Sequence, residues 1–364
     1  MPTILSGMFE PILGIMADAR RRRILVLAGG VLFALSLFLT AASPGFWLLM
    51  LSFVLFYPAS GGFVSLSQAE LMDRDPSRND QNMARWTFAG SLGAALGPLS
   101  LGAAAGLGMG WRPVYAAIGV LTAALVVVTA RVAFPSARRG AARTVGAAAA
   151  RSLSSGAVPP PAAAPDPPEA PLSLQDGLRG ALRSLKEREV VRWLVLLELA
   201  NLMLDVLFGF LALYFVDVVY GSVAQAALAV TVWTVAEMAG DILLIPLLER
   251  VDGLRYLRTS AALVAAAFPC FLIVGPYGAK LALVGVLGLL RAGWYSILQA
   301  RLYSSLPGRS NIAIALSNVA GIVGALIPLG LGALAEAAGL RAAMWALMAA
   351  PLALIVLLPR GGRI

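Results

Sequence analysis

Several polar side chains lie inside long apolar stretches of the sequence, where charged groups are rare. Glu198, Asn201 and Asp205 follow i, i+3, i+7 spacing, which places them on one face of a helix. Glu237 and Asp241 follow i, i+4 spacing and also share a face. A carboxylate in apolar surroundings either binds and releases a proton or pairs with a buried cation. The ionisable members of the set are Glu10, Glu198, Asp205, Glu237, Asp241 and Arg291.

Two hypotheses about this set remain open from the sequence. Counting about 1.5 Å per helical residue places Asp205, Glu237 and Arg291 near the middle of their stretches. In the first hypothesis these residues line a solute cavity, and carboxylates carry protons because the chain has no histidine. The excess of acids over bases would then favour a cationic solute. In the second hypothesis Arg291 and one acid form a structural pair, while Glu10 and Asp241 brace neighbouring loops.

The elements that carry these residues are expected to be membrane-spanning helices. Of the 364 residues, 59% are hydrophobic and 13% are charged, whereas soluble domains contain about 25% charged residues. Apolar runs of about twenty residues recur, which is the length a helix needs to cross a bilayer. The sequence therefore predicts an all-α polytopic membrane protein. The lone Cys270 excludes an intrachain disulfide, and the absence of histidine leads us to expect no metal and no cofactor.

Eleven spans are predicted. Their approximate bounds are 1–17, 24–43, 46–69, 84–107, 112–134, 191–216, 223–248, 257–275, 281–303, 312–335 and 341–358. A long connection, 135–190, separates the fifth span from the sixth. Its Ala- and Pro-rich part, 135–171, is predicted to be disordered. The segment near 173–189 is predicted to form an amphipathic helix on the membrane surface.

The basic residues predict the orientation of the chain in the membrane. Most of the 28 Lys and Arg residues fall in one set of alternate connections, and the opposite set contains Arg112, Lys280 and Arg341. The positive-inside rule places the richer set in the cytoplasm. We therefore expect a plasma-membrane protein with a cytoplasmic C-terminus and a cytoplasmic 135–190 linker. The net charge of +9 is then explained by topology and anionic lipid, and no nucleic-acid partner is expected.

An internal repeat organises the chain. The segment Gln68-Ala69-Glu70-Leu71 returns 231 residues later as Gln299-Ala300-Arg301-Leu302, and Pro76 and Arg78 return as Pro307 and Arg309. A repeat of this length indicates two copies of one helical unit. We expect a first bundle at 1–134 with five helices and a second at 191–364 with six. The partner of span 191–216 would precede residue 1, so we expect that an opening helix is missing through truncation or a wrong start.

The loop after the first span resembles a signature of the major facilitator superfamily, G-x-x-x-D-R-x-G-R-R. Gly14, Asp18, Arg22 and Arg23 match it, whereas Ala19 and Arg21 depart from it. At the repeat offset Asp18 falls on Glu249, which is followed by Arg250. The resemblance implies two pseudo-symmetric helical bundles and secondary transport by alternating access. It also implies a gate role for the loop, in which Arg22 and Arg23 pair with Asp18 in one conformation.

A second signature lies in span 84–107. Gly90, Gly93, Gly97-Pro98 and Gly102 resemble the superfamily's G-x-x-x-G-P-x-x-G-G element, with Leu101 in place of one glycine. The resemblance implies an exchanger, or antiporter. Close packing of small residues, with a bend at Pro98, explains the same residues without any transport role.

The sequence thus predicts a monomeric transporter, proton-coupled, with a small-molecule substrate and the lipid bilayer as its partners. A non-transporting sensor or remnant of the same fold is one alternative. A membrane enzyme of the prenyl-transfer type is another, because Asp73, Asp75 and Asp80 cluster at an interface where such enzymes hold Mg²⁺. Arginines interleave with these acids, so a metal ion would meet little net negative charge, and no enzyme is expected.

Overall fold

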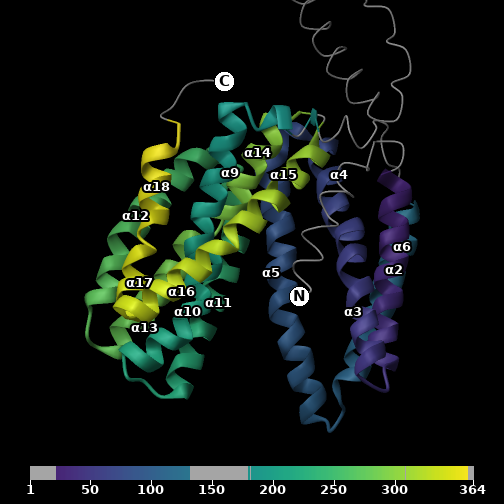
Figure 1. Cartoon of the computed structure of the whole chain (residues 1–364), viewed down its shortest axis with the longest axis horizontal. Helices are drawn as coiled ribbons and strands as arrows, with labels where there is room; N and C mark the ends of the chain where they lie inside the picture. Colours follow the sequence, from purple (N-terminus) through teal and green to yellow (C-terminus); the bar gives the residue numbers. More distant parts are fainter. Residues whose placement is uncertain (1–21, 132–178, 181, 308, 360–364) are drawn as a thin grey trace, which may run out of the picture. The chain divides into compact units, whose positions relative to one another are not determined.

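The computed structural model describes residues 22–131, 179–180, 182–307 and 309–359, and these residues form helices without any strand (Figure 1). The all-α prediction is therefore confirmed for this part of the chain. Several predicted features lie outside it: the span 1–17 with Glu10 and Gly14, the loop acid Asp18, the segment 135–171 and most of the amphipathic helix near 173–189.

Ten helical stretches in the described residues are long and apolar enough to cross a membrane. They correspond to the second to eleventh predicted spans. The first four consist of α2 (Arg22–Ala42), of α3 (Phe46–Ser60) with η1 (Gly61–Ser65) and α4 (Leu66–Arg74), of η2 (Pro76–Arg78) with α5 (Asn79–Gly106), and of α6 (Trp111–Arg131).

The other six spans follow the long connection. They are α9 (Arg188–Asn201) with η3 (Leu202–Val206), α10 (Leu207–Leu213) and η4 (Tyr214–Val218); α11 (Val223–Leu247); α12 (Gly253–Ile273); α13 (Tyr277–Arg291) with α14 (Trp294–Ser305); α15 (Ser310–Gly324) with α16 (Leu326–Ala338); and α17 (Leu340–Ala346) with α18 (Ala349–Leu357).

One predicted boundary differs clearly from the structure. The span predicted at 84–107 begins at Pro76, because the polar residues Asn79, Asp80 and Gln81 continue the helix instead of forming a loop. Their side chains bind other parts of the chain, so the local polarity that suggested a loop is compensated by tertiary contacts. Sequence patterns place helix ends least reliably at such positions.

The helix bounds repeat with the period of the sequence. Helix α12 begins and ends 231 residues after α2, and the stretch from α13 to α14 does the same relative to the stretch from α3 to α4. Both longer stretches are interrupted at equivalent places. Helix α3 ends at Ser60, directly before the π-helical turn η1, and α13 ends at the equivalent Arg291, two residues before Gly293. Gly293 has a φ of +82°, which glycine adopts readily.

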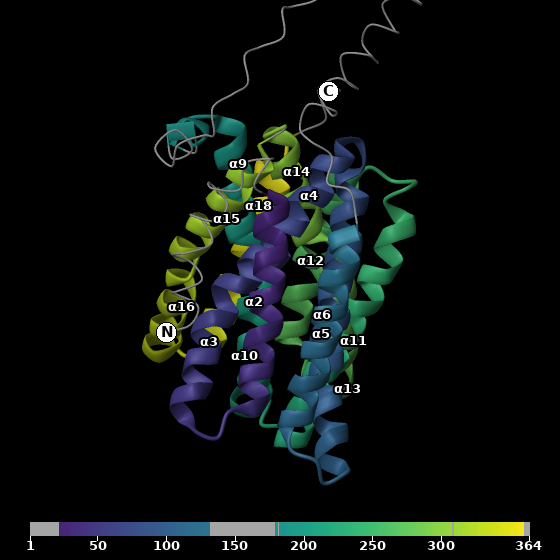
Figure 2. The same ribbon diagram turned by 90° about the vertical axis from the view of Figure 1, so that its right-hand side faces the viewer.

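The described residues form two compact units. The first unit contains the described residues of 1–76, 101–185 and 306–318. In it α2 packs against α3 and α6 (Figure 2). A Cβ atom added to Gly29 would lie 2.8 Å from the backbone of Gly62, so the close contact of α2 with the next span depends on glycine. Val26 and Leu37 fill the core beside it.

The second unit contains the described residues of 77–100, 186–305 and 319–364. In it α11 packs on α13, α12 packs on α13 and α18, and α9 packs on α14 and α18. Its largest buried side chains are aromatic and include Trp233, Trp294, Tyr303 and Phe268.

Lys280 belongs to the first turn of α13 and is 5% exposed, although the sequence placed it in a connection. Its ammonium group donates to the carbonyl of Phe271 at 2.6 Å and to the hydroxyl of Tyr214 at 3.1 Å. A cation is favourable against the free carbonyls at a helix C-terminus, and Lys280 supplies it at the end of α12.

Each unit includes a segment of the other sequence repeat. Residues 77–100, from the first repeat, group with helices of the second repeat, and residues 306–318, from the second repeat, group with helices of the first. The two segments are equivalent, because α5 begins at Asn79 and α15 begins 231 residues later at Ser310. The predicted division into bundles at 1–134 and 191–364 stays a prediction.

Candidate functional site

A buried ion pair lies in the second unit. The guanidinium group of Arg291 forms an ion pair with Glu237, and Arg291 is 4% exposed. The guanidinium carbon lies 4.5 Å from the ring centroid of Trp233, which precedes Glu237 by one turn of α11. This arrangement combines a charge-assisted hydrogen bond with a cation–π contact.

Glycines make this arrangement possible. A Cβ atom on Gly288 would lie 2.9 Å from the carbonyl oxygen of Trp233, and one on Gly240 would lie 3.0 Å from that of Leu289. Helices α11 and α13 therefore approach as closely as backbone atoms allow. Arg291 is the last residue of α13, where the helix dipole favours a positive charge.

Two other predicted residues flank this pair. Asp205 lies in the π-helical turn η3 and interacts electrostatically with Arg291. Such turns are frequent at functional sites because they offset the side chains of one helical turn. The structure thus places Asp205 near the ion pair of Glu237 with Arg291.

Glu198 belongs to a separate contact. Asn201 hydrogen-bonds its carboxylate, as their i, i+3 spacing allows. The carboxylate also lies against the backbone of Gly324, at the end of α15, where any Cβ atom would overlap it.

Asp241 is 3% exposed on α11. Its carboxylate accepts a hydrogen bond of 2.6 Å from the hydroxyl of Ser91, which lies on α5. The observed hydrogen bond joins Asp241 to a helix of the first repeat, and the hypothesis that Asp241 braces the loop after α11 stays a prediction.

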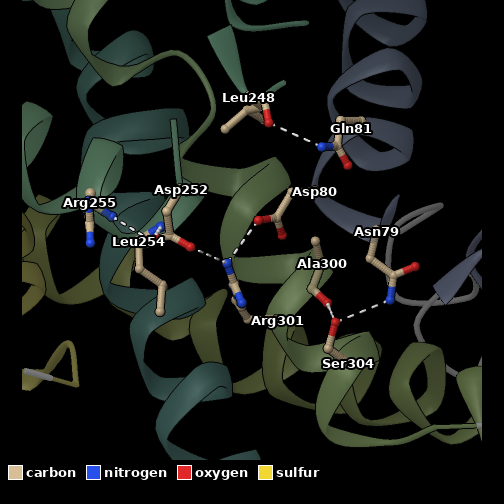
Figure 3. Close-up of polar contacts among 10 residues, drawn as sticks. All are labelled: Asn79, Asp80, Gln81, Leu248, Asp252, Leu254, Arg255, Ala300, Arg301 and Ser304. Atoms are coloured by element: carbon tan, nitrogen blue, oxygen red, sulfur yellow. Dashed lines mark hydrogen bonds and ion pairs between the residues drawn. The ribbon is translucent and has the colours of Figure 1, made fainter. Parts of the chain in front are cut away.

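Three residues outside the predicted cavity and gate sets meet at the start of α5 (Figure 3). A guanidinium nitrogen of Arg301, on α14, lies 2.9 Å from the carboxylate of Asp80 and 3.4 Å from that of Asp252. Asp252 also caps α12, because it accepts hydrogen bonds from the backbone of Leu254 and Arg255, each of 3.1 Å. We call Asp80, Asp252 and Arg301 the Arg301 triad.

Two hydrogen bonds flank the triad. The amide of Asn79 donates to the hydroxyl of Ser304 at 3.1 Å, and the amide of Gln81 donates to the carbonyl of Leu248 at 3.1 Å (Figure 3). The first turn of α5 is thereby joined to α14 and to the end of α11.

The first unit contains an equivalent junction. Arg22 forms ion pairs with Glu70 at 3.1 Å and with Asp73 at 2.7 Å. Asp73 also accepts a hydrogen bond from Ser310, at the start of α15. Asp73 and Ser310 are the repeat equivalents of Ser304 and Asn79, so the two hydrogen bonds are one contact present in both repeats.

The remaining loop residues are less constrained. Arg23 donates to the carbonyl of Ala130 at 2.9 Å, and Arg250 is exposed. Glu249 lies 4.0 Å from Arg78, and both side chains are half exposed, so this pair contributes little. The expected pairing of Arg22 and Arg23 with Asp18 lies outside the described residues.

The glycine-rich stretch of α5 shows no close helix contact. A Cβ atom on Gly93 or Gly97 would have no described atom within 4 Å. Helix α5 continues through Pro98 without interruption. The described part of the chain therefore does not show the close packing that small residues at these positions suggested.

Arg301 could have been found from the repeat alone. It occupies the position of Glu70, and a reversal of charge at a repeated position indicates that the partners have changed as well. Asp80 was interpreted with Asp73 as part of a self-neutralised loop, because the distant arginine that binds it cannot be identified from sequence spacing.

Comparisons with known proteins agree with this architecture. The crystal structure of the E. coli fucose:proton symporter has a TM-score of 0.76 and 14% identity, over 98% of this chain and 88% of that one. A proton:xylose symporter has a TM-score of 0.65 and 16% identity, over 97% and 84%. The human organic anion transporter MFSD10 has a TM-score of 0.63 and 20% identity, over 98% and 82%.

Sequence comparison identifies the family. No curated protein sequence matches the chain. The sequence profile described as Major Facilitator Superfamily matches residues 1–327, which is most of the chain. The chain belongs to the Major Facilitator Superfamily, and the predicted all-α fold of that family is confirmed.

Proposed function

We propose that this protein is a proton-coupled secondary transporter that moves a small solute across the plasma membrane by alternating access. The observation that carries the proposal is the pair of equivalent contacts Asp73–Ser310 and Ser304–Asn79. Each joins the start of a helix from one repeat to a helix of the other. Alternating access requires the repeats to rock against one another, so these contacts have to form in one state and break in the other.

The Arg301 triad strengthens one of these contacts. Asp80 and Arg301 are about one-fifth exposed, so their ion pair is less weakened by solvent than a pair on the surface. A contact between repeats biases a two-state equilibrium by the free energy that it contributes in one state only. The positive-inside rule places the triad at the cytoplasmic end, which makes it part of an inner gate.

The group around Arg291 is the proposed solute site. Asp205, Glu237 and Arg291 lie in apolar helices of the second repeat, and the first-repeat equivalents of Glu237 and Arg291 are the neutral Ser6 and Ser60. An ionisable group at this depth is costly unless it serves binding or pairing. The excess of acids over the single base favours a solute that carries a positive charge.

Membership of the superfamily and its transporter neighbours exclude the enzyme alternative. Asp73 and Asp80, which suggested a metal-dependent enzyme, bind Arg22 and Arg301 instead. Exchange of protons for solute, with net efflux, is the mode that the glycine-rich stretch of α5 favours. We further propose a functional monomer, with the C-terminus and the 135–190 linker in the cytoplasm.

Transport in reconstituted vesicles tests the proposal. A panel of cationic, anionic and neutral solutes is added with and without a pH gradient, and solute and proton fluxes are measured. We expect accumulation of one solute class that depends on the gradient, and Asp205→Asn is expected to lower its rate at least tenfold. Saturable binding without flux would support the non-transporting sensor instead.

A further inference from the structure

The carboxylate of Asp241 has an unusual environment. It is 3% exposed, and the hydrogen bond that it accepts comes from a neutral hydroxyl, that of Ser91 at 2.6 Å. A buried carboxylate depends on such donors, because an ionised group that loses them in apolar surroundings is strongly destabilised.

The charged and titratable groups around Asp241 are engaged elsewhere. Glu237, one turn earlier on α11, forms an ion pair with Arg291 of α13. Arg291 interacts electrostatically with Asp241 but uses its ion pair for Glu237. Tyr256 of α12 donates its hydroxyl to the carbonyl of Ala292 at 2.9 Å. From α5, the neighbouring group is Ser91, so the hydroxyl of Ser91 is the donor on which the ionised form depends.

The hydrogen bond between Ser91 and Asp241 has no counterpart at the equivalent positions of the repeat. Ser91 belongs by sequence to the first repeat, and Asp241 belongs to the second. Their repeat equivalents are Ile322 and Glu10, and isoleucine has no hydroxyl to donate. The contact is therefore not part of the scaffold that both repeats share.

Movement of the repeats changes what Asp241 can bind. When α5 separates from α11, the carboxylate loses the hydroxyl of Ser91, which is the one hydrogen-bond donor that the structure gives it among the described residues. A proton on the carboxyl group removes the negative charge and with it the need for that donor. Proton binding at Asp241 therefore competes with the full-strength hydrogen bond from Ser91, because a neutral carboxyl group is a weaker acceptor than a carboxylate, and such coupling is reciprocal.

We propose that Asp241 is the proton-binding carboxyl group of this protein and that the proton opens the contact between α5 and α11. The inference rests on the proposed transport function, and it adds the site of the coupling ion. Solute would bind around Arg291. Glu237 would link the solute site to the proton site, because it pairs with Arg291 and lies one turn of α11 before Asp241. The proton would enter and leave at the carboxylate oxygen that accepts from Ser91.

Infrared spectroscopy of the purified full-length protein tests the proposal without a solute, with the proton as the only probe. The carbonyl stretch of a protonated carboxyl group is followed as the pH is changed. We expect one titrating band to be absent in Asp241→Asn. Ser91→Ala removes a hydrogen bond to the ionised form of Asp241. The pH midpoint of the titrating band is therefore expected to rise by about one unit in this variant.

Two matched variants serve as controls. Ser100→Ala removes a hydroxyl from the same helix, where it donates to the carbonyl of Gly97 at 2.7 Å. Asp217→Asn removes an exposed carboxylate from the same repeat. Both should leave the band and its midpoint unchanged, and unfolding temperatures show whether every variant is folded.

The outcomes separate this inference from the function on which it rests. An unchanged titration in Asp241→Asn overturns the inference even if vesicles show proton-driven transport. A titrating band assigned to Asp241 that does not respond to Ser91→Ala overturns the proposed competition. Vesicles without solute flux overturn the proposed function, whatever the spectra show.

Discussion

Arg301 stands at the repeat position of Glu70, and the two residues make ion pairs of opposite polarity with partners that lie one repeat position apart. Glu70 binds Arg22, the first residue of α2, at 3.1 Å, and Arg301 binds Asp252, which caps α12, at 3.4 Å. Arg301 also reaches Asp80 on α5, whereas the position equivalent to Asp80 is the neutral Asn311. Both repeats therefore have an ion pair at this junction, but the ion pair that reaches α5 of the other repeat is formed by Arg301 alone among these residues.

This difference makes Asp80 and Asp252 a matched pair for testing the gate. Asp80→Asn removes the ion pair that joins the repeats, and we expect the inner-open population to rise about fivefold, which corresponds to roughly 1 kcal/mol. Asp252→Asn removes an ion pair within one repeat and keeps a residue that caps helices well. We therefore expect Asp252→Asn to raise the inner-open population less than Asp80→Asn does.

The population can be measured with an impermeant thiol reagent. The variant Thr87→Cys introduces a thiol on α5, Cys270→Ser removes the native one, and the rate at which the reagent labels the introduced thiol is followed. The labelling rate should rise in Asp80→Asn. Equal rates in the two asparagine variants would show that the Asp80–Arg301 pair does not hold the gate.

The hydrogen bond between Asn79 and Ser304 predicts a reversible lock. With Cys270→Ser, the variant Asn79→Cys/Ser304→Cys places two thiols where the side chains are in contact at 3.1 Å. Oxidation should form a disulfide and stop transport, because the first turn of α5 can no longer leave α14. Reduction should restore the rate, and each single-cysteine variant should be insensitive to oxidant. Undiminished transport with the disulfide formed would mean that this contact does not open.

The sequence predicted the helices and the repeat well, because both depend on apolar length and on residue identity at a fixed spacing. The described spans from α2 onward match the predicted ones to within a few residues at most ends. The repeat even predicted which residues are equivalent, as the contacts of Asp73 and Ser304 illustrate. These properties are local or periodic, so they can be read from one chain.

The partners of individual charges could not be predicted in the same way. Spacing placed Glu237 and Arg291 at similar depth, but it did not decide which acid would bind the arginine. Asp241 is one turn from Glu237 and binds a serine of α5 instead. Such choices depend on the rotation and approach of helices that are distant in sequence, here set by Gly240 and Gly288.

Arg22 is expected to stabilise the first unit more than Arg23 does. Its side chain is 7% exposed and binds two acids, so Arg22→Gln leaves Glu70 and Asp73 without their cation. We expect a loss of about 2 kcal/mol in the free energy of unfolding. Arg23→Gln removes an exposed hydrogen bond to a carbonyl and should cost less than about 0.5 kcal/mol. Denaturation of purified protein in detergent measures both, and similar losses would contradict the importance of the two ion pairs.

Gly324 and Gly93 occupy the same repeat position and provide the sharpest test of the Glu198 contact. A Cβ atom on Gly324 would overlap the carboxylate of Glu198, whereas one on Gly93 would have no described atom within 4 Å. Gly324→Ala should therefore displace Glu198 and lower stability by about 1–3 kcal/mol. Gly93→Ala should be neutral or stabilising by up to about 1 kcal/mol, because alanine favours a helix interior more than glycine does. Combining Gly324→Ala with Glu198→Ala makes the prediction specific: the second substitution removes the overlapping group, so the double variant should recover part of the lost unfolding temperature. If Glu198→Ala brings no recovery, the cost at Gly324 has another origin, and the carboxylate does not rest against that glycine.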